Sequence, residues 1–346
     1  MESTCHPRLG VPDRREGGGR WNIISSFSIK RYTFNGIIKR NKTRIGSVKN
    51  TLKITSAMKM VASAKLHKAQ TAIGNKLPYE QKLHRILAGL LQSDELRAAL
   101  VKELGFGEKG SRAPVVLQDV ETDGLPSMPD VKRVALVGFS SNSSLCGSFN
   151  ANIIKKFNDT VAQLLLRGYS KSDIDVYAVG RKISEAARKS GFILKEDYSD
   201  IADKPSYDRA SDLAEVLIDS FAQGEVEQVI FIYSHFASAA SQPVVRTNYL
   251  PLALNDYSSE NGPMDYILEP DPLSLVKDLL PKVLLLKIYT VILDANAAEH
   301  AARTLAMQLA SDNAQDLISE LTLAYNKGRQ QEITAEILDL VGGTMA

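Results

Sequence analysis

The longest run of helix-type spacing lies at the C-terminal end of the chain. Residues 282–341, about sixty in number, contain no proline and one glycine, Gly328. At about 1.5 Å of rise per residue, such a helix would be about 90 Å long, too long to be buried in one globular domain. Small and apolar residues recur every three or four positions, at Ala295, Ala298, Ala302, Leu305, Leu309, Leu317, Leu321, Ala324 and Gly328. This narrow seam predicts a coiled-coil helix.

A partner helix is visible near the N-terminus. The same spacing occurs there, without a proline before Pro78, at Ile45, Val48, Leu52, Thr55, Met58, Ala62, Leu66, Ala69 and Ile73. Residues 283–341 hold eight acids against four bases, whereas this first helix holds no acid. Opposite flanking charges favour pairing between the two helices over pairing of each with itself. The pattern therefore predicts a long antiparallel coiled coil, rather than two amphipathic helices on an ordinary domain.

The segment between these helices alternates strands with helices. The apolar runs at residues 131–138, 175–180 and 229–233 predict buried strands, and residues 243–250 a partly polar fourth strand. Helices are expected at residues 152–167, 182–190 and 210–221. This order predicts a Rossmann-like α/β domain with a mostly parallel sheet and an edge strand at its end. The expected fold class is thus α/β with a coiled coil of the terminal helices.

Changes in composition place the domain boundaries. Residues 1–36, with a Gly triplet and two prolines, are expected to be a disordered extension or a targeting segment. Residues 37–92 are expected to be the N-terminal coiled-coil helix, 93–130 a loop, 131–268 the α/β domain and 269–346 the C-terminal coiled-coil helix.

Charge is distributed unevenly along the chain. Net charge is +2, yet residues 17–79 carry thirteen Lys and Arg and no acid, which leaves the remaining residues at about −11. A solvated basic helix face explains this stretch most simply, and an acidic protein partner comes next. Nucleic acid is disfavoured because no aromatic residue follows Asn35 before Pro78 to stack on a base. No apolar run approaches the ~20 residues that a membrane span requires.

The loop at residues 138–147 lies where nucleotide-binding folds hold phosphates. It has neither Gly-x-Gly-x-x-Gly nor Gly-Lys-Ser/Thr, so no dinucleotide or P-loop site is predicted. Its serines, Ser140, Ser141, Ser143 and Ser144, are expected to cap the following helix rather than bind an anion. Cys146 is interpreted as a packing residue, since no histidine lies nearby in sequence. Asp173, Asp175 and Asp203 are expected to be solvated. We therefore predict no catalytic residue, no metal site and no cofactor.

Several motifs together identify the chain as resembling a known family. They are SVKNTLKITSAMKMVASAK at residues 47–65, EHAARTLAM at 299–307, DNA at 312–314 and LAYNKGRQQEIT at 323–334, with LCG at 145–147 and EPDP at 269–272. These motifs resemble the γ subunit of F-type ATP synthase from about residue 37 to the end. The serine-rich loop at residues 140–144 replaces the more usual charged and glycine-containing version.

The resemblance implies a central rotor shaft that couples proton flow to ATP synthesis or hydrolysis and is not itself an enzyme. It implies contacts with the α3β3 hexamer, with the ε subunit (δ in mitochondrial naming) and with the c-subunit ring. It implies a peripheral location on the cytoplasmic face of the bacterial inner membrane, or on the matrix side of the mitochondrial inner membrane. The residues expected to contact partners are Lys49, Lys53, Met58 and Lys59 on the first helix and Arg329, Gln330, Gln331 and Thr334 on the second.

Two other classes of function remain open from the residues alone. One is a stand-alone α/β enzyme with a helical dimerisation arm, which would bind nucleotide by itself. The other is a nucleic-acid-binding coiled coil that uses the basic first helix, and its binding would weaken steeply with salt. Co-purification with a nucleotide-binding hexamer separates the rotor hypothesis from both.

Overall fold

The computed structural model describes residues 21–90, 115–116, 133–253, 269 and 271–344. The chain divides into a larger unit, residues 55–310, and a smaller unit, residues 1–54 with 311–346. Two long helices, α1 (Trp21–Leu90) and α7 (Pro272–Thr344), contribute to both units. The predicted fold class, a mixed α/β domain between long terminal helices, is confirmed. None of the described helices combines the length and the apolar character that crossing a membrane demands.

Five strands of the larger unit form one sheet. They are β2 (Val134–Phe139), β3 (Ile174–Val179), β4 (Leu194–Asp197), β5 (Gln228–Ser234) and β6 (Val244–Leu250). The spatial order is β4-β3-β2-β5-β6, parallel except for the antiparallel edge strand β6. A separate parallel pair joins β1 (Val115–Val116) to β7 (Leu252–Ala253). The short strand β4 was not predicted, because its charged residues lack an apolar run.

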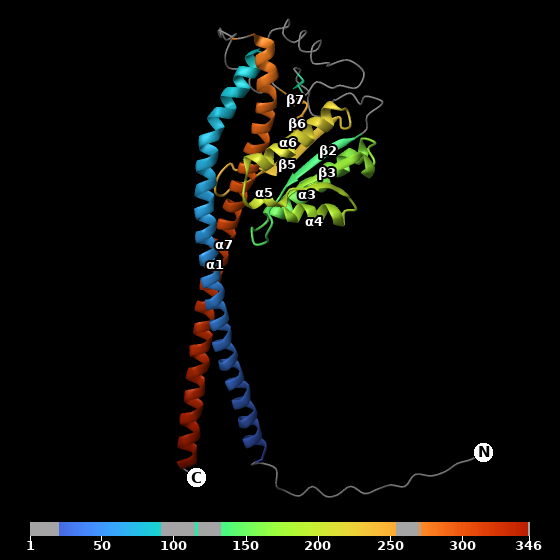
Figure 1. The fold of residues 1–346 in the computed structure, drawn as a ribbon. Coiled ribbons are helices and arrows are strands. Elements are labelled where there is room, and N and C mark those ends of the chain that lie inside the picture. The colour runs from blue at the N-terminus through green and yellow to red at the C-terminus, as the bar shows by residue number, and fades with distance from the viewer. Residues whose placement is uncertain (1–20, 91–114, 117–132, 254–268, 270, 345–346) are drawn as a thin grey trace, which may run out of the picture. The chain divides into compact units, whose positions relative to one another are not determined.

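Helices cover both faces of this sheet (Figure 1). The elements that connect the strands are α3 (Phe149–Leu166), η1 (Lys171–Asp173), α4 (Arg181–Lys189), α5 (Ser199–Asp203) and α6 (Tyr207–Ala222). Alternate residues of each central strand face opposite layers. One layer packs Leu136 and Val176 against α3 and α4, and the other packs Val137 and Phe231 against α6, α7 and α1. Strands buried on both faces explain why their sequences are continuously apolar.

Both long helices run through a proline. Helix α7 begins at Pro272, within the segment 269–346 predicted for it but before the proline-free run at 282–341, and continues through Pro281. Proline removes one backbone hydrogen bond, but buried Val276, Leu280 and Val283 hold the helix on both sides of it. Helix α1 likewise runs through Pro78 and begins at Trp21, inside the predicted extension. Residues 1–20 lie outside the described residues, and the domain boundaries proposed above stay predictions.

In the smaller unit, α1 and α7 pair through a narrow seam. The α7 side of the seam consists of the buried residues Ser311, Ala314, Ile318, Leu321 and Gly328. A Cβ built on Gly328 would lie 3.2 Å from Cγ1 of Ile38 on α1, so the missing side chain lets the two backbones approach closely.

Part of the predicted α7 seam is wrong. Leu305, Leu309 and Ala324 are exposed, and the buried face passes instead through Ser311 and Ile318. The buried residues Ser311, Ala314, Ile318 and Leu321 also follow steps of three and four, so the spacing alone does not decide which of two such stripes is buried. On α1 the predicted stripe agrees better with burial, because Thr55, Ala62, Leu66 and Ala69 are all buried.

Candidate functional site

The sheet has a topological switch point between β2 and β5. Strand β2 comes first in the chain, β3 and β4 follow on one side of it, and β5 lies on the other. Open α/β sheets bind ligands in the crevice at the carboxyl ends of the strands at such a point. The loop after β2, residues 140–148, and the segment after β5, which begins at His235, border this crevice. Residues 294–303 of α7, which we call the α7 polar segment, contact both.

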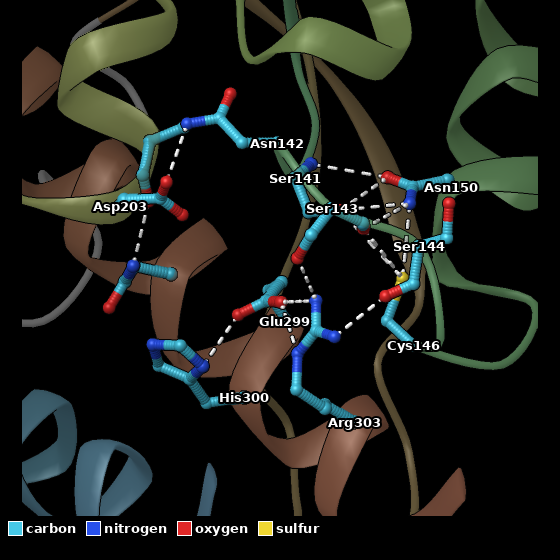
Figure 2. A network of polar contacts seen from close by, with 12 residues as sticks. Ser141, Asn142, Ser143, Ser144, Cys146, Asn150, Asp203, Glu299, His300 and Arg303 are labelled. Carbon is cyan, nitrogen blue, oxygen red and sulfur yellow. Dashed lines mark hydrogen bonds and ion pairs between the residues drawn. The ribbon is translucent and has the colours of Figure 1, made fainter. Parts of the chain in front are cut away.

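Arg303 joins the α7 polar segment to the loop after β2 (Figure 2). Its Nη1 donates to the carbonyl oxygen of Ser144 at 2.7 Å, and its Nη2 donates to Oγ of Ser143 at 2.9 Å. Its Nε donates to Oε1 of Glu299 at 2.8 Å, one turn earlier on α7. Arg303 is only 9% exposed. A planar guanidinium thus connects two segments 159 residues apart in sequence.

Glu299 is the anion that accompanies this buried arginine. It accepts hydrogen bonds from Arg303, and its Oε2 lies 2.6 Å from Nδ1 of His300. Burial by itself would raise the pKa of the Glu299 carboxyl, but the hydrogen bond and charge of His300, together with Arg303, outweigh burial and lower this pKa. The carboxylate therefore stays ionised, and the buried positive charge of Arg303 is compensated.

Two further residues, Asp294 and Asn296, fix the α7 polar segment at its other end. Asp294 accepts a hydrogen bond from the backbone N–H of Phe236 at 2.9 Å, and its Oδ2 lies 2.7 Å from Nδ1 of His235. Asn296 donates from Nδ2 to the carbonyl oxygen of Ala202, in α5, at 2.8 Å. The segment is therefore held by the loop after β2, by the segment after β5 and by α5.

The loop after β2 has its own internal network. Asn150 donates from Nδ2 to Oγ of Ser141 at 2.8 Å and to Sγ of Cys146 at 3.0 Å. Cys146 is 2% exposed, as predicted for a packing residue. Leu145 at the loop tip has a positive φ of 68°, a conformation that non-glycine residues rarely adopt, and is 61% exposed. The contacts on both sides of it hold the backbone in this shape.

The prediction that the loop serines, Ser140, Ser141, Ser143 and Ser144, cap α3 is wrong. The N-cap residue of α3 is Ser148, and no side chain caps it. Oγ of Ser140 instead accepts from the backbone N–H of Ile183, in the first turn of α4, at 2.9 Å. A Cβ on Gly180 would lie 2.1 Å from the Ser140 carbonyl oxygen, so only glycine permits this close approach. The serine caps a helix that lies farther along the chain.

Asp173, Asp175 and Asp203, the three aspartates singled out from the sequence, do not form a common carboxylate site. Asp203 accepts from Nδ2 of Asn142 at 2.8 Å, and Asp173 accepts from the backbone of Ser170 at 2.8 Å. Asp175 was expected to be solvated, but it is buried beside Arg133 and within 3.8 Å of the Lys195 ammonium. Among the described residues, no group of three or more His, Cys, Asp or Glu side chains could hold a metal ion.

A cavity of about 250 Å³ lies beside the α7 polar segment. Its walls come from α1, α5, α7 and the loop after β2, and are formed by Ala57, Met58, Val61, Ala62, Lys65, Ser143, Asp203, Glu299, His300 and Arg303. The α1 side is mostly apolar, whereas the α7 side carries the buried ion pair. At the carboxyl ends of β2 and β3, the α7 residues Ile292, Ala295, Asn296 and Glu299 leave a space of only about 10 Å³. A nucleotide could bind there only by displacing part of the chain's own helix.

The expected partner-contact residues have different surroundings. In the smaller unit, Lys49 and Lys53 are exposed, and so are all four residues of the α7 group. Within that group, Thr334 donates from Oγ1 to the backbone carbonyl of Gln330 at 2.8 Å, inside its own helix. In the larger unit, Met58 and Lys59 are half-buried, and Met58 lines the cavity. Their roles as contacts stay predictions.

Sequence reasoning missed the α7 polar segment. Asp294 was counted only as a charge flanking a coiled coil, Glu299 and Arg303 as such charges and as part of the motif at 299–307, and His235 was not singled out. One signal was present: these charges follow directly on residues 283–293, where apolar residues are too frequent for a two-helix seam. A helix buried on more than one side needs partners for any charge it carries there.

The chain was compared with known proteins. A family model described as ATP synthase matches residues 38–346. The ATP synthase gamma chain of Bacteroides fragilis is 50% identical over 313 residues, which cover 89% of this chain and 99% of that protein. The gamma chain of Phocaeicola vulgatus is 47% identical over 312 residues, with the same shares covered.

Among solved structures, a chain of the mitochondrial ATP synthase of Euglena gracilis, from a cryo-EM structure of its OSCP, F1 and c-ring, superposes with a TM-score of 0.56. The match covers 90% of this chain and 94% of that one at 19% sequence identity. At this identity the comparison shows a shared fold and nothing further.

Proposed function

Because the chain belongs to the ATP synthase gamma chain family, we propose that it is the central rotor shaft of an F1 sector. It couples proton flow through the membrane sector to ATP synthesis, or to hydrolysis, at catalytic sites on the surrounding α and β subunits. The stand-alone α/β enzyme is not favoured by the comparisons.

The observation that carries this proposal is the continuity of α7. The helix spans 73 residues, is fixed into the α/β domain by its polar segment and continues without interruption into the smaller unit. After Pro281, α7 contains no further proline, and a helix with an uninterrupted backbone hydrogen-bond pattern transmits a twist along its axis. This arrangement suits a shaft, whereas a dimerisation arm needs no such fixing at its base.

We further propose that the chain itself is non-catalytic. Its α7 occupies the crevice where an α/β enzyme would bind substrate, and the buried ion pair there, Glu299 and Arg303, is engaged internally and with the loop after β2. A base or nucleophile committed to such contacts is not available to a substrate. Turnover by the purified chain, lost on substitution of one of its own residues, would contradict this.

The proposed partners are the α3β3 hexamer, the ε subunit and the c-subunit ring. Lys49, Lys53 and Lys59 would face acidic surfaces of the hexamer, with Met58 beside them. The exposed polar residues of α7, Arg329, Gln330, Gln331 and Thr334, would form hydrogen bonds with the hexamer that change partners as the shaft turns. Their exposure in the smaller unit supports this role, because a helix that only packed would present apolar residues.

For location, we propose the cytoplasmic face of a bacterial inner membrane, where the chain would be held as a peripheral subunit by its partners. The support is the similarity to gamma chains of Bacteroides fragilis and Phocaeicola vulgatus. Membrane fractions of the native cells, washed with low-salt buffer containing a chelator, should release the chain together with α and β subunits. Release of the chain alone would argue against this assembly.

The function is tested by reconstitution. The chain is combined with the α and β subunits of its own organism, and ATP turnover and rotation of a bead attached to the chain are recorded. We expect turnover with rotation in steps, and lower turnover in the double variant Arg329→Ala/Gln330→Ala at equal assembly. A complex that hydrolyses ATP while the bead stays still would contradict the rotor function. Unchanged turnover in the double variant would contradict only the contact role.

A further inference from the structure

We propose that the α7 polar segment is a torsional lock, which sets how stiffly the α/β domain is fastened to the shaft. The proposal rests on the rotor function above and assigns specific residues to one mechanical property of the rotor. The lock has three fastenings: Asp294 to the segment after β5, Asn296 to α5, and Arg303 with Glu299 to the loop after β2.

The three sets of contacts hold α7 on two opposite sides. At about 100° per residue, Asn296 and Arg303 project in nearly the same direction, whereas Asp294 projects about 180° away. The first two contact Ala202 and Ser144, and Asp294 contacts Phe236. A helix held on opposite sides cannot roll about its axis without breaking a hydrogen bond. Contacts on a single face would oppose that roll with fewer hydrogen bonds.

Directional contacts resist twisting where apolar packing resists mainly separation. Before the polar segment, α7 packs Val283, Ile288 and Ile292 into the core of the larger unit, which keeps the helix and sheet together. Burial of apolar area is non-directional, so a small rotation costs little as long as the area stays buried. Hydrogen bonds involving charged groups weaken quickly when their angles change. The polar segment therefore supplies stiffness that packing does not.

The buried charges give a reason to assign a role beyond stability. Desolvation of a buried ion pair is costly, and hydrophobic residues of similar volume often stabilise a fold as well or better. Glu299 and Arg303 are 8% and 9% exposed. What the pair provides is a fixed geometry, with Arg303 held simultaneously by Glu299, Ser143 and Ser144. The ion pair lies shortly before Ala310, the last residue of α7 in the larger unit.

The test measures rotor stiffness in the assembled complex. The hexamer is fixed to a surface and stalled with a non-hydrolysable ATP analogue, and a bead is attached through Lys189→Cys on the exposed end of α4. The variance of the bead's angle reports torsional stiffness. If the fastenings act in parallel and add, Arg303→Gln and Asp294→Asn should each raise the variance about 1.5-fold, and together more than twofold. Arg303→Lys, which keeps charge but not the planar fork, should fall between.

Controls separate stiffness from folding. Arg209→Gln removes an arginine that pairs with Asp200 and Asp212 on the surface of the same domain, and its variance should equal that of the unmodified chain. If Arg303→Gln does not assemble, Ser143→Ala removes one of its hydrogen bonds at an exposed position and should give a smaller rise in variance. A merely structural role would lower the melting temperature while leaving the variance of the assembled complex unchanged.

A second measurement does not depend on the rotor function. In the isolated chain, Arg303→Gln should increase hydrogen exchange of the backbone amides in residues 141–148 at least several-fold, and Asp294→Asn should do so at Phe236. Failure of the unmodified complex to rotate would contradict the proposed function and leave this exchange result to decide the lock. Unchanged exchange, or unchanged variance in assembled variants, would overturn the lock.

Discussion

Helix α7 is held in two different ways along its length. In the polar segment, residues 294–303, it is held by hydrogen bonds and buried charges that involve three elements of the α/β domain. In the smaller unit it is held by a seam of small and apolar residues that includes Gly328, where an added Cβ would lie 3.2 Å from Ile38 of α1. The first arrangement fixes one orientation, whereas the second requires little beyond close approach and leaves the other faces of the helix exposed.

This difference predicts which of the two regions of α7 should tolerate substitution. A buried charge network depends on every member, because removal of one ion leaves its partner desolvated and unpaired. A seam of small residues depends on volume, so its members can be exchanged for others of similar size. The predictions below test this contrast, beginning with the largest expected effect.

Glu299→Gln should be the most damaging of these substitutions. The amide keeps the size of the side chain but leaves the positive charge of Arg303 buried without its counter-ion, which typically costs about 3–5 kcal/mol. Urea unfolding of the isolated chain measures the loss. The double variant Glu299→Gln/Arg303→Met should recover much of it, because the unpaired charge is then gone. A loss that is not recovered in the double variant would contradict the charge explanation.

Gly328→Leu should weaken the seam by about 1–3 kcal/mol, because the new side chain has to displace Ile38. The matched control is Gly46→Leu in the same unit, where a Cβ would meet nothing within 4 Å. There the change should stabilise the helix by up to about 1 kcal/mol, since glycine is a poor helix former. Thermal melting followed by circular dichroism compares them, and an equal effect at both positions would contradict the close approach.

Glu80→Gln tests an interhelical carboxylate outside the α7 polar segment. Burial raises the pKa of Glu80, although Lys287, 3.9 Å away, opposes the shift. A raised pKa in the folded state means that the folded chain binds this proton more tightly. The stability from this group is therefore present below the ordinary pKa of 4.5 and is lost as pH rises through the folded value. Unlike Glu299, whose pKa is lowered, Glu80 should be dispensable at neutral pH.

The expected result is that Glu80→Gln unfolds at equal or higher denaturant concentration than the unmodified chain at pH 7 to 8. This advantage should shrink as the pH falls toward 5. Denaturation midpoints at several pH values measure it. A Glu80→Gln chain that is less stable at every pH would show that the Lys287 contact outweighs burial.

The smallest effect is expected at Lys49 and Lys53, which belong to neither the seam nor the polar segment. Both are exposed, and exposed ion pairs contribute about 0–1 kcal/mol each. Lys49→Ala and Lys53→Ala should leave unfolding of the chain unchanged and alter assembly only slightly.

Lys59→Glu should reduce proton pumping per ATP hydrolysed, because it replaces attraction to an acidic partner with repulsion. Normal pumping by an assembled Lys59→Glu complex would argue against that contact.

The regular elements of the fold could be predicted from sequence because their signals are local. Strand β2 and helix α3 are readable from apolar runs and spacing, and both lie close to the predicted positions. The polar segment could not be read in this way. Arg303 and Ser144 are 159 residues apart, and nothing near either residue specifies the other. Serine also has several local uses, so only the folded backbone decides that Ser140 caps α4.

The α7 polar segment lies where related sheet topologies hold a diffusible ligand. A helix that belongs to the same polypeptide is present at an effective concentration far above that of any metabolite, since its tether keeps it beside the crevice. Binding of a nucleotide would have to overcome this advantage as well as break the contacts of Arg303 and Asp294. In terms of binding, the domain resembles a receptor whose crevice is occupied by a tethered segment of its own chain.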